Sequence, residues 1–281
     1  MNAVETTSWE DFEQKLKELR SQCGSESFPL LFRGQGNSTW SLATTLDRSA
    51  RNGMTFREYY DMITGGVGPE VETFSGVDVP ERSTEVAKSF SDRGLLFKFP
   101  SEFPDMPLYR YMVYLRHLGF PSPLLDWSRS PYVPAFFAFR EDPLLKVEKR
   151  SIYAFCKSLT GITGGAVGEP MIFPLGPYIQ THHRHFRQRC DYTFCGGFDV
   201  SSDQWRFESH QKVFDNRRPK QDLLWKFDIP SSERNKVLRI LNDYNLNAFS
   251  LFGSEESLLE TMWLREYVLR RSADSRAEAA R

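Results

Sequence analysis

The spacing of hydrophobic residues predicts a chain of alternating helices and short strands. Near the N-terminus, Trp9, Phe12, Leu16 and Leu19 recur at helical spacing directly after Ser8, a residue type that suits a helix N-cap. The same period predicts further helices over residues 108–118, 130–139, 231–244 and 254–271.

Short apolar or alternating runs predict buried strands between these helices. Four such runs cover residues 28–32, 151–157, 223–229 and 247–252. The segments expected to form loops cover residues 33–37, 120–130 and 161–168. Gly24 is expected to end the first helix, and glycine-rich breaks make residues 50–105 the least regular part. Because we find no internal repeat and no interdomain linker, the prediction is a single α+β domain, ending in a frayed tail.

Composition places the chain among ordinary globular proteins but adds one unusual feature. Hydrophobic residues make up 40% of the 281 residues, which is enough for a sizeable core. Aromatic residues reach 14%, with 23 phenylalanines, which indicates an aromatic-rich core or a stacking site. The net charge of -1 points to no particular partner, so any contact with nucleic acid would require a local basic patch.

Four cysteines without a CxxC pair indicate no disulfide framework. The first ten residues lack the apolar stretch of a signal peptide, and no run of 18 apolar residues could span a membrane. We therefore expect a cytoplasmic protein with reduced thiols and no membrane partner.

The first candidate site residues follow the first predicted strand. An arginine at the end of a buried strand, here Arg33, is costly without an anionic partner, and its planar fork suits phosphate or carboxylate. The flanking Gly34 and Gly36 would let a ligand approach the backbone closely, beside the polar Gln35. A structural ion pair between Arg33 and an acidic residue is an equally open interpretation.

The second candidate segment runs from residue 117 to residue 139. Asp126, Ser128 and Ser130 precede a predicted helix N-terminus, which favours anions and hydrogen-bonding side chains. Asp126 could orient His117 or pair with Arg33. Helix capping explains Ser130, and an aromatic plug is the alternative for Trp127. We predict that this segment and residues 32–35 build one polar pocket.

Two further clusters have simpler alternatives. Residues 182–189 hold six potential cations near Tyr192 and Phe194, which would suit phosphates and bases, although a solvated basic face is equally open. Adjacent histidines would point apart on a strand, so no metal site is predicted there. Three acids, Glu255, Glu256 and Glu260, fit the start of the last helix as dipole partners. No GxSxG, P-loop or GxGxxG motif is present.

Several motifs together resemble the FRG domain family. The run LFRGQ at residues 31–35, followed by WSL at residues 40–42, resembles the opening that gives the family its name. HLGFPSPLLDWS at residues 117–128 is similar to the family's H-Y-G-L-P-T-R-L-L-D-W-T, which leads into a helix of small and aromatic residues.

The later landmarks of the family are looser in this chain. Arg184, Gln188 and Tyr192 fit an arginine-glutamine-aromatic pattern, with Cys190 where glycine is usual. LFGSEESL at residues 251–258 departs at several positions from L-F-P-D-L-D-G-L. The resemblance implies a helical lead-in over residues 1–27, an FRG domain over 28–271 and a disordered tail over 272–281.

FRG domains are often encoded near prophage, toxin or defence genes, and their layout looks like that of arginine-serine-glutamate ADP-ribosyltransferases. The resemblance therefore implies an ADP-ribosyltransferase-like mixed sheet with flanking helices. It also implies NAD as substrate, a nucleic-acid or protein acceptor that the basic stretch could present, and a possible antitoxin. The residues implied to bind NAD are Arg33, Gly34, Gln35, Trp127 and Ser128. Trp127 or a phenylalanine would stack on nicotinamide.

The catalytic candidates are Asp126, His117 and Gln188, the last of which lies near the place where such enzymes carry a glutamate. That carboxylate would stabilise an oxocarbenium-like state as nicotinamide leaves. The alternative function is a noncatalytic module that binds a nucleotide or a nucleic acid. A nuclease would need a cluster of acids around a divalent cation, which the sequence does not show.

Overall fold

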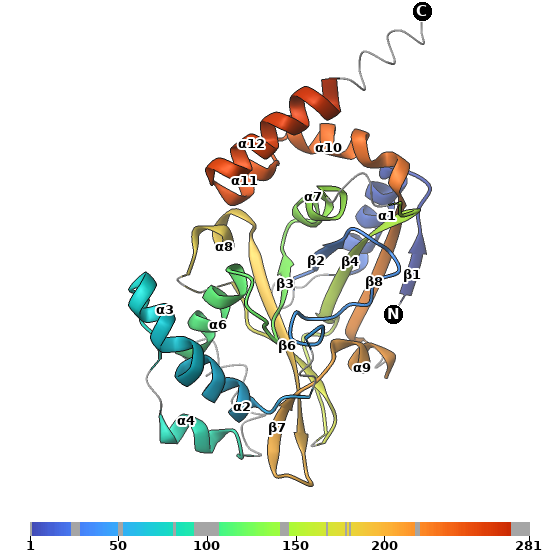
Figure 1. Cartoon of the computed structure of the whole chain (residues 1–281). Helices are drawn as coiled ribbons and strands as arrows, with labels where there is room; N and C mark the ends of the chain where they lie inside the picture. The colour runs from blue at the N-terminus through green and yellow to red at the C-terminus, as the bar shows by residue number, and fades with distance from the viewer. Residues whose placement is uncertain are drawn as a thin grey trace, which may run out of the picture.

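A mixed β-sheet forms the centre of the molecule (Figure 1). The computed structural model describes residues 2–23, 29–49, 53–80, 83–92, 107–140, 146–166, 168–177, 179, 181–216 and 220–270. Within these residues the sheet has eight strands in the order β1-β8-β4-β2-β3-β6-β5, with β7 paired to β6. The strands are β1 (Asn2–Glu5), β2 (Leu31–Gln35), β3 (Leu125–Ser128), β4 (Lys149–Ser158), β5 (Met171–Pro174), β6 (Cys190–Asp199), β7 (Gln204–Phe207) and β8 (Gln221–Pro230).

The sheet is weakly joined at its centre. Strand β2 pairs with β4 along all five of its residues, and β3 pairs with β6 along all four. Between β2 and β3, by contrast, a single register pair, Phe32 with Ser128, is present in the described chain. We call this junction the seam. The sheet therefore consists of two halves, β1-β8-β4-β2 and β3-β6 with β5 and β7, that meet at one residue pair.

Helices flank both halves of the sheet and complete an α+β fold. The helical segments are α1 (Trp9–Gln22), α2 (Phe56–Asp61), η1 (Met62–Val67), α3 (Gly68–Ser75), α4 (Thr84–Ser89), α6 (Pro107–His117), α7 (Tyr132–Arg140), α8 (His183–Arg187), α9 (His210–Asp215), η2 (Ser231–Glu233), α10 (Arg234–Asp243), α11 (Ala248–Phe252), α12 (Glu255–Trp263) and η3 (Leu264–Leu269). None of the described helices is both long and apolar enough to cross a membrane.

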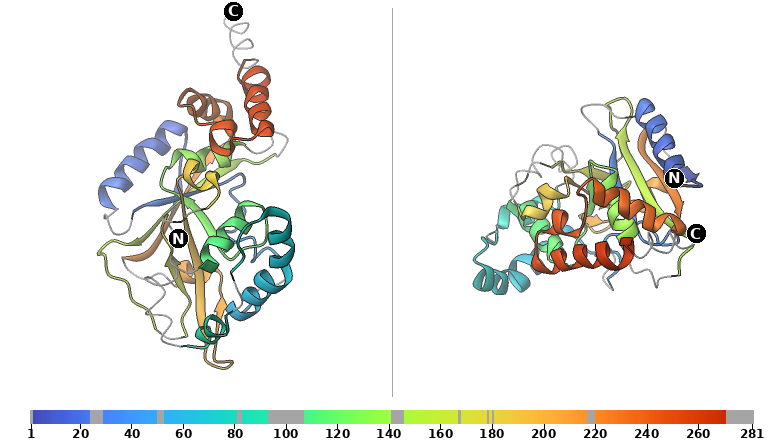
Figure 2. Two further views of the ribbon diagram at one scale, coloured as in Figure 1. Left: turned by 90° about the vertical axis from the view of Figure 1, so that its left-hand side faces the viewer. Right: turned by 90° about the horizontal axis from the view of Figure 1, so that it is seen from above.

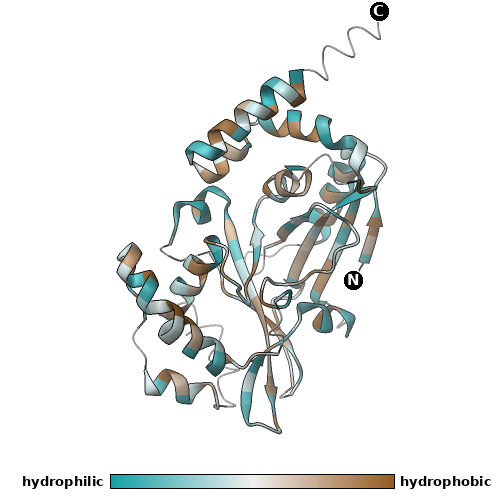
Figure 3. Ribbon diagram, in the orientation of Figure 1, coloured by the Kyte–Doolittle hydropathy of each residue, from teal (hydrophilic) through white to brown (hydrophobic). Residues whose placement is uncertain are grey.

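Two large hydrophobic cores follow the division of the sheet. One packs α1, α7 and α10 against β2, β4 and β8, with Trp9, Phe12 and Phe136 fully buried in it. The other packs α2, η1 and α6 against β5, β6 and β7. Figure 2 shows α1 and the α2 to α4 group on opposite sides of the molecule, and Figure 3 shows apolar residues along the strands between them. The aromatic-rich core that the composition indicated is therefore present.

Most of the predicted elements are confirmed. Ser8 caps α1 by accepting a hydrogen bond from the Asp11 amide, and the helix buries Trp9, Phe12, Leu16 and Leu19. The predicted helices at residues 108–118 and 130–139 correspond to α6 and α7, and those at 231–244 and 254–271 correspond to η2 with α10 and to α12 with η3. The predicted strands at residues 151–157 and 223–229 lie within β4 and β8. Gly24, residues 93–105 and the tail at 272–281 lie outside the described residues.

Three local predictions are wrong. Residues 33–35 continue β2 instead of forming a loop, because their backbones pair with β4. The expected loop at residues 120–130 contains β3, which pairs with β6. The expected strand at 247–252 is helix α11, whose start is a capping box between Asn247 and Ser250.

Candidate functional site

A cavity with a volume of about 800 Å³ opens at the seam. Strands β2 and β3, the end of α6, and helices α7, α8, α11 and α12 contribute side chains to its wall. All eight residues predicted from the sequence border it: Arg33, Gly34, Gln35, His117, Asp126, Trp127, Ser128 and Gln188. The two segments predicted to share one pocket therefore do so.

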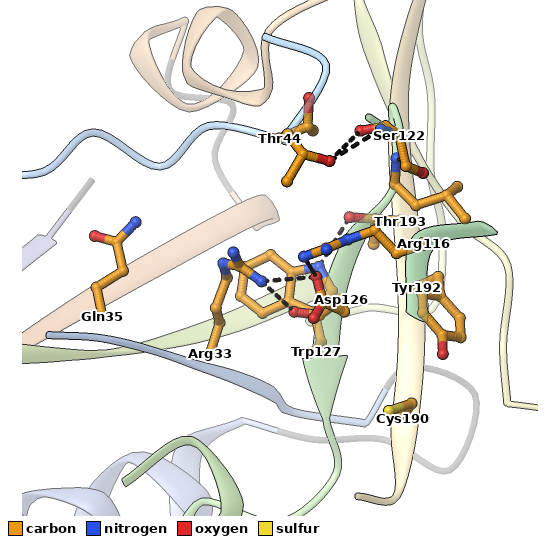
Figure 4. Close-up of polar contacts among 12 residues, drawn as sticks. Arg33, Gln35, Thr44, Arg116, Ser122, Asp126, Trp127, Cys190, Tyr192 and Thr193 are labelled. Carbon is orange, nitrogen blue, oxygen red and sulfur yellow. Dashed lines mark hydrogen bonds and ion pairs between the residues drawn. The ribbon is translucent and has the colours of Figure 1, made fainter. Parts of the chain in front are cut away.

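One carboxylate at the seam holds two arginines (Figure 4). Arg33 Nη1 donates to the backbone oxygen of Asp126 at 2.8 Å and to its Oδ1 at 3.0 Å. Arg116 Nη2 donates to the same Oδ1 at 2.6 Å. At the seam the two strands share one register pair, so the guanidinium of Arg33 supplies a hydrogen bond to the Asp126 carbonyl. Arg33 therefore forms an ion pair, which was one of its two interpretations from the sequence. The other interpretation, anion binding, concerns the same side chain.

Electrostatics keep this cluster ionised. Burial by itself would raise the pKa of Asp126, but Arg116 and Arg33 outweigh it and hold that pKa well below its ordinary value. The charge of Asp126 is also the main reason why the pKa of Arg116 is raised. Burial lowers the pKa of Arg33, yet an arginine stays protonated in proteins. The cluster carries two positive charges against one negative charge.

Positive charge exceeds negative charge around the whole cavity. Five arginines border it, Arg33, Arg48, Arg116, Arg140 and Arg184, against two carboxylates, Asp126 and Glu260. This leaves an excess of three positive charges. Arg33 Nη2 and Arg116 Nη1 make no hydrogen bond to another described residue, so both guanidinium groups retain donors. Such a wall favours a ligand with several anionic oxygens.

Partly exposed aromatic rings also border the cavity. Trp40 is 41% exposed, and Phe137 and Phe252 are half-buried. The guanidinium groups of Arg140 and Arg184 lie 4.6 Å and 5.3 Å from the centre of the Phe252 ring. These contacts hold both arginines at the cavity edge through cation–π attraction.

Trp127 does not offer a ring face to the cavity, contrary to the stacking role inferred from the sequence. Its side chain is 2% exposed and stacks on Phe155 with ring centres 5.3 Å apart. Its Nε1 donates to Thr193 Oγ1 at 2.8 Å. The aromatic plug is therefore the correct interpretation of this residue.

Three residues that border the cavity also hold the fold together: Gly34, Ser128 and Gln188. Helix α7 fills the space where a Cβ of Gly34 would lie, so the close approach is that of a helix and not of a ligand. Ser128 Oγ donates to the Gln188 carbonyl at 2.7 Å, and Gln188 Nε2 donates to the Leu251 carbonyl at 3.3 Å. Together these bonds fasten β3 to α8 and α11.

His117 lies where α6 ends and is hydrogen-bonded behind the cavity wall. Its Nε2 lies 2.8 Å from the hydroxyl of Tyr192, on β6. Burial lowers the pKa of His117 to about 4, so the imidazole is neutral near pH 7.

The basic segment at residues 182–189 is helical at its centre, where it forms α8. Arg184 borders the cavity and His185 is buried, whereas Phe186 is 84% exposed. Among the described residues, one group of side chains could hold a metal ion: His117, His185 and Cys190, with ligand atoms within 4.8 Å of one another. It contains no carboxylate, so it does not support a nuclease.

Sequence reasoning missed several residues of the cavity wall. Arg116 directly precedes His117 and could have been found from its place at the end of the helix. Arg140 and Glu260 form a two-bond ion pair at 2.5 Å and 2.6 Å between α7 and α12. Glu260 was assigned to helix capping, and nothing in its local sequence indicates that it borders a cavity.

Comparison with curated proteins and with solved structures finds no match. The family comparison does find one, and it spans β2, α6, β3 and α7, which supply Arg33, Arg116, Asp126 and Gly34 with its helix partner. Residues 29–145 match the family model of the FRG domain, and this matched segment supplies the centre of the candidate site.

Proposed function

We propose that the cavity binds a nucleotide and that the chain transfers ADP-ribose from NAD to an acceptor. The observation that carries this proposal is the combination, on one cavity of about 800 Å³, of five arginines with three partly exposed aromatic rings. Arginines suit the diphosphate, and aromatic faces suit the adenine and nicotinamide rings. The volume is in the range of sites for small molecules and cofactors.

Five side chains of the cavity wall would have roles in this reaction. Arg33 and Arg116 would bind the diphosphate through their remaining donors, and His117 would bind a ribose hydroxyl. The glycosidic bond between ribose C1′ and nicotinamide breaks, and nicotinamide leaves with the electron pair. Asp126 or Glu260 would stabilise the oxocarbenium-like ribose. A nucleophile of the acceptor then forms a bond to C1′ and releases its proton.

The position of Arg33 on the central strand supports this proposal by resemblance. An arginine-glycine pair on β2, and a strand β3 that leads into helix α7, follow the order found in arginine-serine-glutamate ADP-ribosyltransferases. Arg184 of the basic segment borders the cavity, and the exposed Phe186 and the arginines of the same segment would contact a nucleic-acid or protein acceptor. A toxin or defence role, with an antitoxin to restrain it, would fit such an activity.

A specific observation favours a second function, binding without catalysis. Both carboxylates in the cavity wall are already paired with arginines, Asp126 with two and Glu260 with one. Gln188, in the place expected for a glutamate, is 8% exposed and bonded to Leu251. In this case Arg33 would still be required for ligand binding, and NAD would remain intact.

The deciding experiment incubates the folded chain with labelled NAD and cell extract, and then with DNA, RNA and protein separately. Nicotinamide release and transfer of label are expected, with large losses in Arg33→Lys and Glu260→Gln. Arg206→Lys is the matched control, because Arg206 pairs with Asp199 at 3.0 Å outside the cavity. Binding of NAD without release of nicotinamide would identify the noncatalytic module. Folded protein that binds neither NAD nor DNA nor RNA would exclude both functions.

A further inference from the structure

Three side chains behind the cavity form one hydrogen-bonded chain that ends on a backbone carbonyl. His117 Nε2 lies 2.8 Å from the Tyr192 hydroxyl oxygen, and that oxygen lies 3.2 Å from His185 Nδ1. His185 Nε2 lies 2.7 Å from the carbonyl oxygen of Pro177. The rings of His185 and Tyr192 stack with centres 5.6 Å apart, and both side chains are buried. Packing therefore holds the chain in one arrangement.

The Pro177 carbonyl determines the direction of each bond. A carbonyl oxygen can only accept, so His185 Nε2 carries a hydrogen. Burial lowers the pKa of His185, which favours the neutral ring, and the Nδ1 of that ring accepts from the Tyr192 hydroxyl. A hydroxyl has one hydrogen, so the tyrosine oxygen in turn accepts from His117 Nε2. The lone pair of His117 is then on Nδ1.

We propose that Tyr192 and His185 are positioning residues that hold His117 as the Nε2–H tautomer, with Nδ1 presented to the cavity as a hydrogen-bond acceptor. His117 borders the cavity, and its Nδ1 has no hydrogen-bond partner among the described residues. Because arginine donors dominate the wall, an acceptor there recognises a ligand group that carries a hydrogen, such as a ribose hydroxyl. The ligand's identity in this inference rests on the proposed function; the tautomer does not.

The same atoms admit a different ligand, a metal ion, which the hydrogen bonds disfavour. The Sγ of Cys190 lies within 4.8 Å of a ring nitrogen of both histidines. However, the Tyr192 hydroxyl already bonds one ring nitrogen of each histidine. Burial also raises the pKa of Cys190, so a metal ion would have to displace the thiol proton in order to bind there.

The test measures the tautomer of His117 by nitrogen NMR of the histidine rings in the ligand-free full chain. Wild-type protein is expected to show a protonated Nε2 and an unprotonated Nδ1 at His117. Tyr192→Phe removes one hydroxyl and should give a mixture of both tautomers. His185→Leu, which removes the other end of the chain, should do the same and serves if Tyr192→Phe does not fold.

Tyr109→Phe is the matched control, because Tyr109 is a buried neighbour of Tyr192. The hydroxyl of Tyr109 donates to the Gly176 carbonyl and takes no part in the hydrogen bonds between His117, Tyr192 and His185. It should leave the His117 tautomer unchanged. An Nδ1–H tautomer in the wild type, or an unchanged tautomer in both variants, would overturn the proposal. Stoichiometric zinc that shifts both histidine rings would also overturn it, in favour of a metal site.

A second measurement is the affinity for NAD. If Tyr192→Phe leaves half of the molecules in the competent tautomer, the dissociation constant should rise at least about twofold. Failure of wild-type protein to bind NAD would reject the proposed function alone, because the NMR measurement uses no ligand. Binding with unchanged affinity in a variant whose tautomer has become mixed would reject the role of Nδ1 in recognition.

Discussion

The Cβ that Gly34 lacks would lie 1.9 Å from the backbone oxygen of Pro134. Strand β2 and helix α7 thus approach so closely that no side chain fits between them. This contact places the helix beside Arg33 and forms one wall of the cavity. The glycine of the family's motif therefore sets the distance between two elements of the site.

Gly34→Ala should destabilise the fold by about 3 kcal/mol, since α7 must move to accommodate the added methyl group. The measurement is the free energy of unfolding in urea. Gly66→Ala is the control, because nothing lies within 4 Å of its added Cβ and alanine is favoured in a helical segment. Equal stability of wild type and Gly34→Ala would show that α7 is not seated on β2 as described.

Asp126→Asn should lower stability and make it depend on phosphate. The change leaves Arg33 and Arg116 without their shared negative charge, at a cost of about 1–2 kcal/mol after allowance for partial exposure. Phosphate should therefore raise the melting temperature of the variant more than that of the wild type. Asp199→Asn, which disrupts the Arg206 pair away from the cavity, should show no such phosphate effect. An equal response of both variants would mean that the cavity does not bind anions.

Stability should fall as the pH drops from 7 to 5. Burial lowers the pKa of His210 from 6.5 to about 3 and that of His117 to about 4. Because the folded pKa values lie below the unfolded ones, the unfolded chain takes up more protons in this range. The stabilisation is complete above about pH 6.5 and declines below it, by up to about 1.4 kcal/mol per pH unit for each histidine.

The pH prediction is checked by urea unfolding at pH 7.5, 6 and 5 in the wild type and in His210→Gln. The glutamine can form a hydrogen bond with Thr193, whose Oγ1 lies 3.0 Å from His210 Nε2, but it does not titrate. It should make the pH dependence of the unfolding free energy shallower. The same slope in wild type and His210→Gln would contradict the burial of a neutral ring.

Lys157→Met should destabilise the fold by about 3–5 kcal/mol, because it leaves the Asp222 carboxylate buried without a cation. Lys157 Nζ donates to Asp222 Oδ1 and to the Ile172 carbonyl, both at 2.7 Å, and the two side chains are 6% and 3% exposed. The control is Lys212→Met, which removes an exposed pair with Glu208 and should change the urea midpoint little. Similar effects of the two changes would show that the Lys157 pair is solvated.

Helices long enough to repeat their hydrophobic pattern over several turns were predictable from the sequence, and short elements were not. Trp9, Phe12, Leu16 and Leu19 span three turns of α1, so only one face can be apolar. Helix α11 has five residues, too few to distinguish a helical from an alternating pattern. Its capping box, Asn247 with Ser250, was the one local signal for a helix.

The same limit applied to the site. The pocket was predictable because Arg33 and Asp126 lie in the two most distinctive motifs, and charge pairing between them was one of the interpretations. Gly34 was misjudged because a glycine after an apolar run signals a loop, whereas its reason lies in the Pro134 backbone, 100 residues away in sequence. Arg184 and Glu260 reach the cavity from distant segments, which no local pattern reveals.

The seam limits how firmly the two halves of the sheet are connected. Beyond the single register pair, the side-chain bridge from Arg33 to Asp126 joins the two halves of the sheet. An anion bound by Arg33 on one half of the sheet and by Arg116 on the other would connect the two halves across the seam. We therefore expect a bound anion to slow hydrogen exchange in β2 and β3 more than in the outer strands.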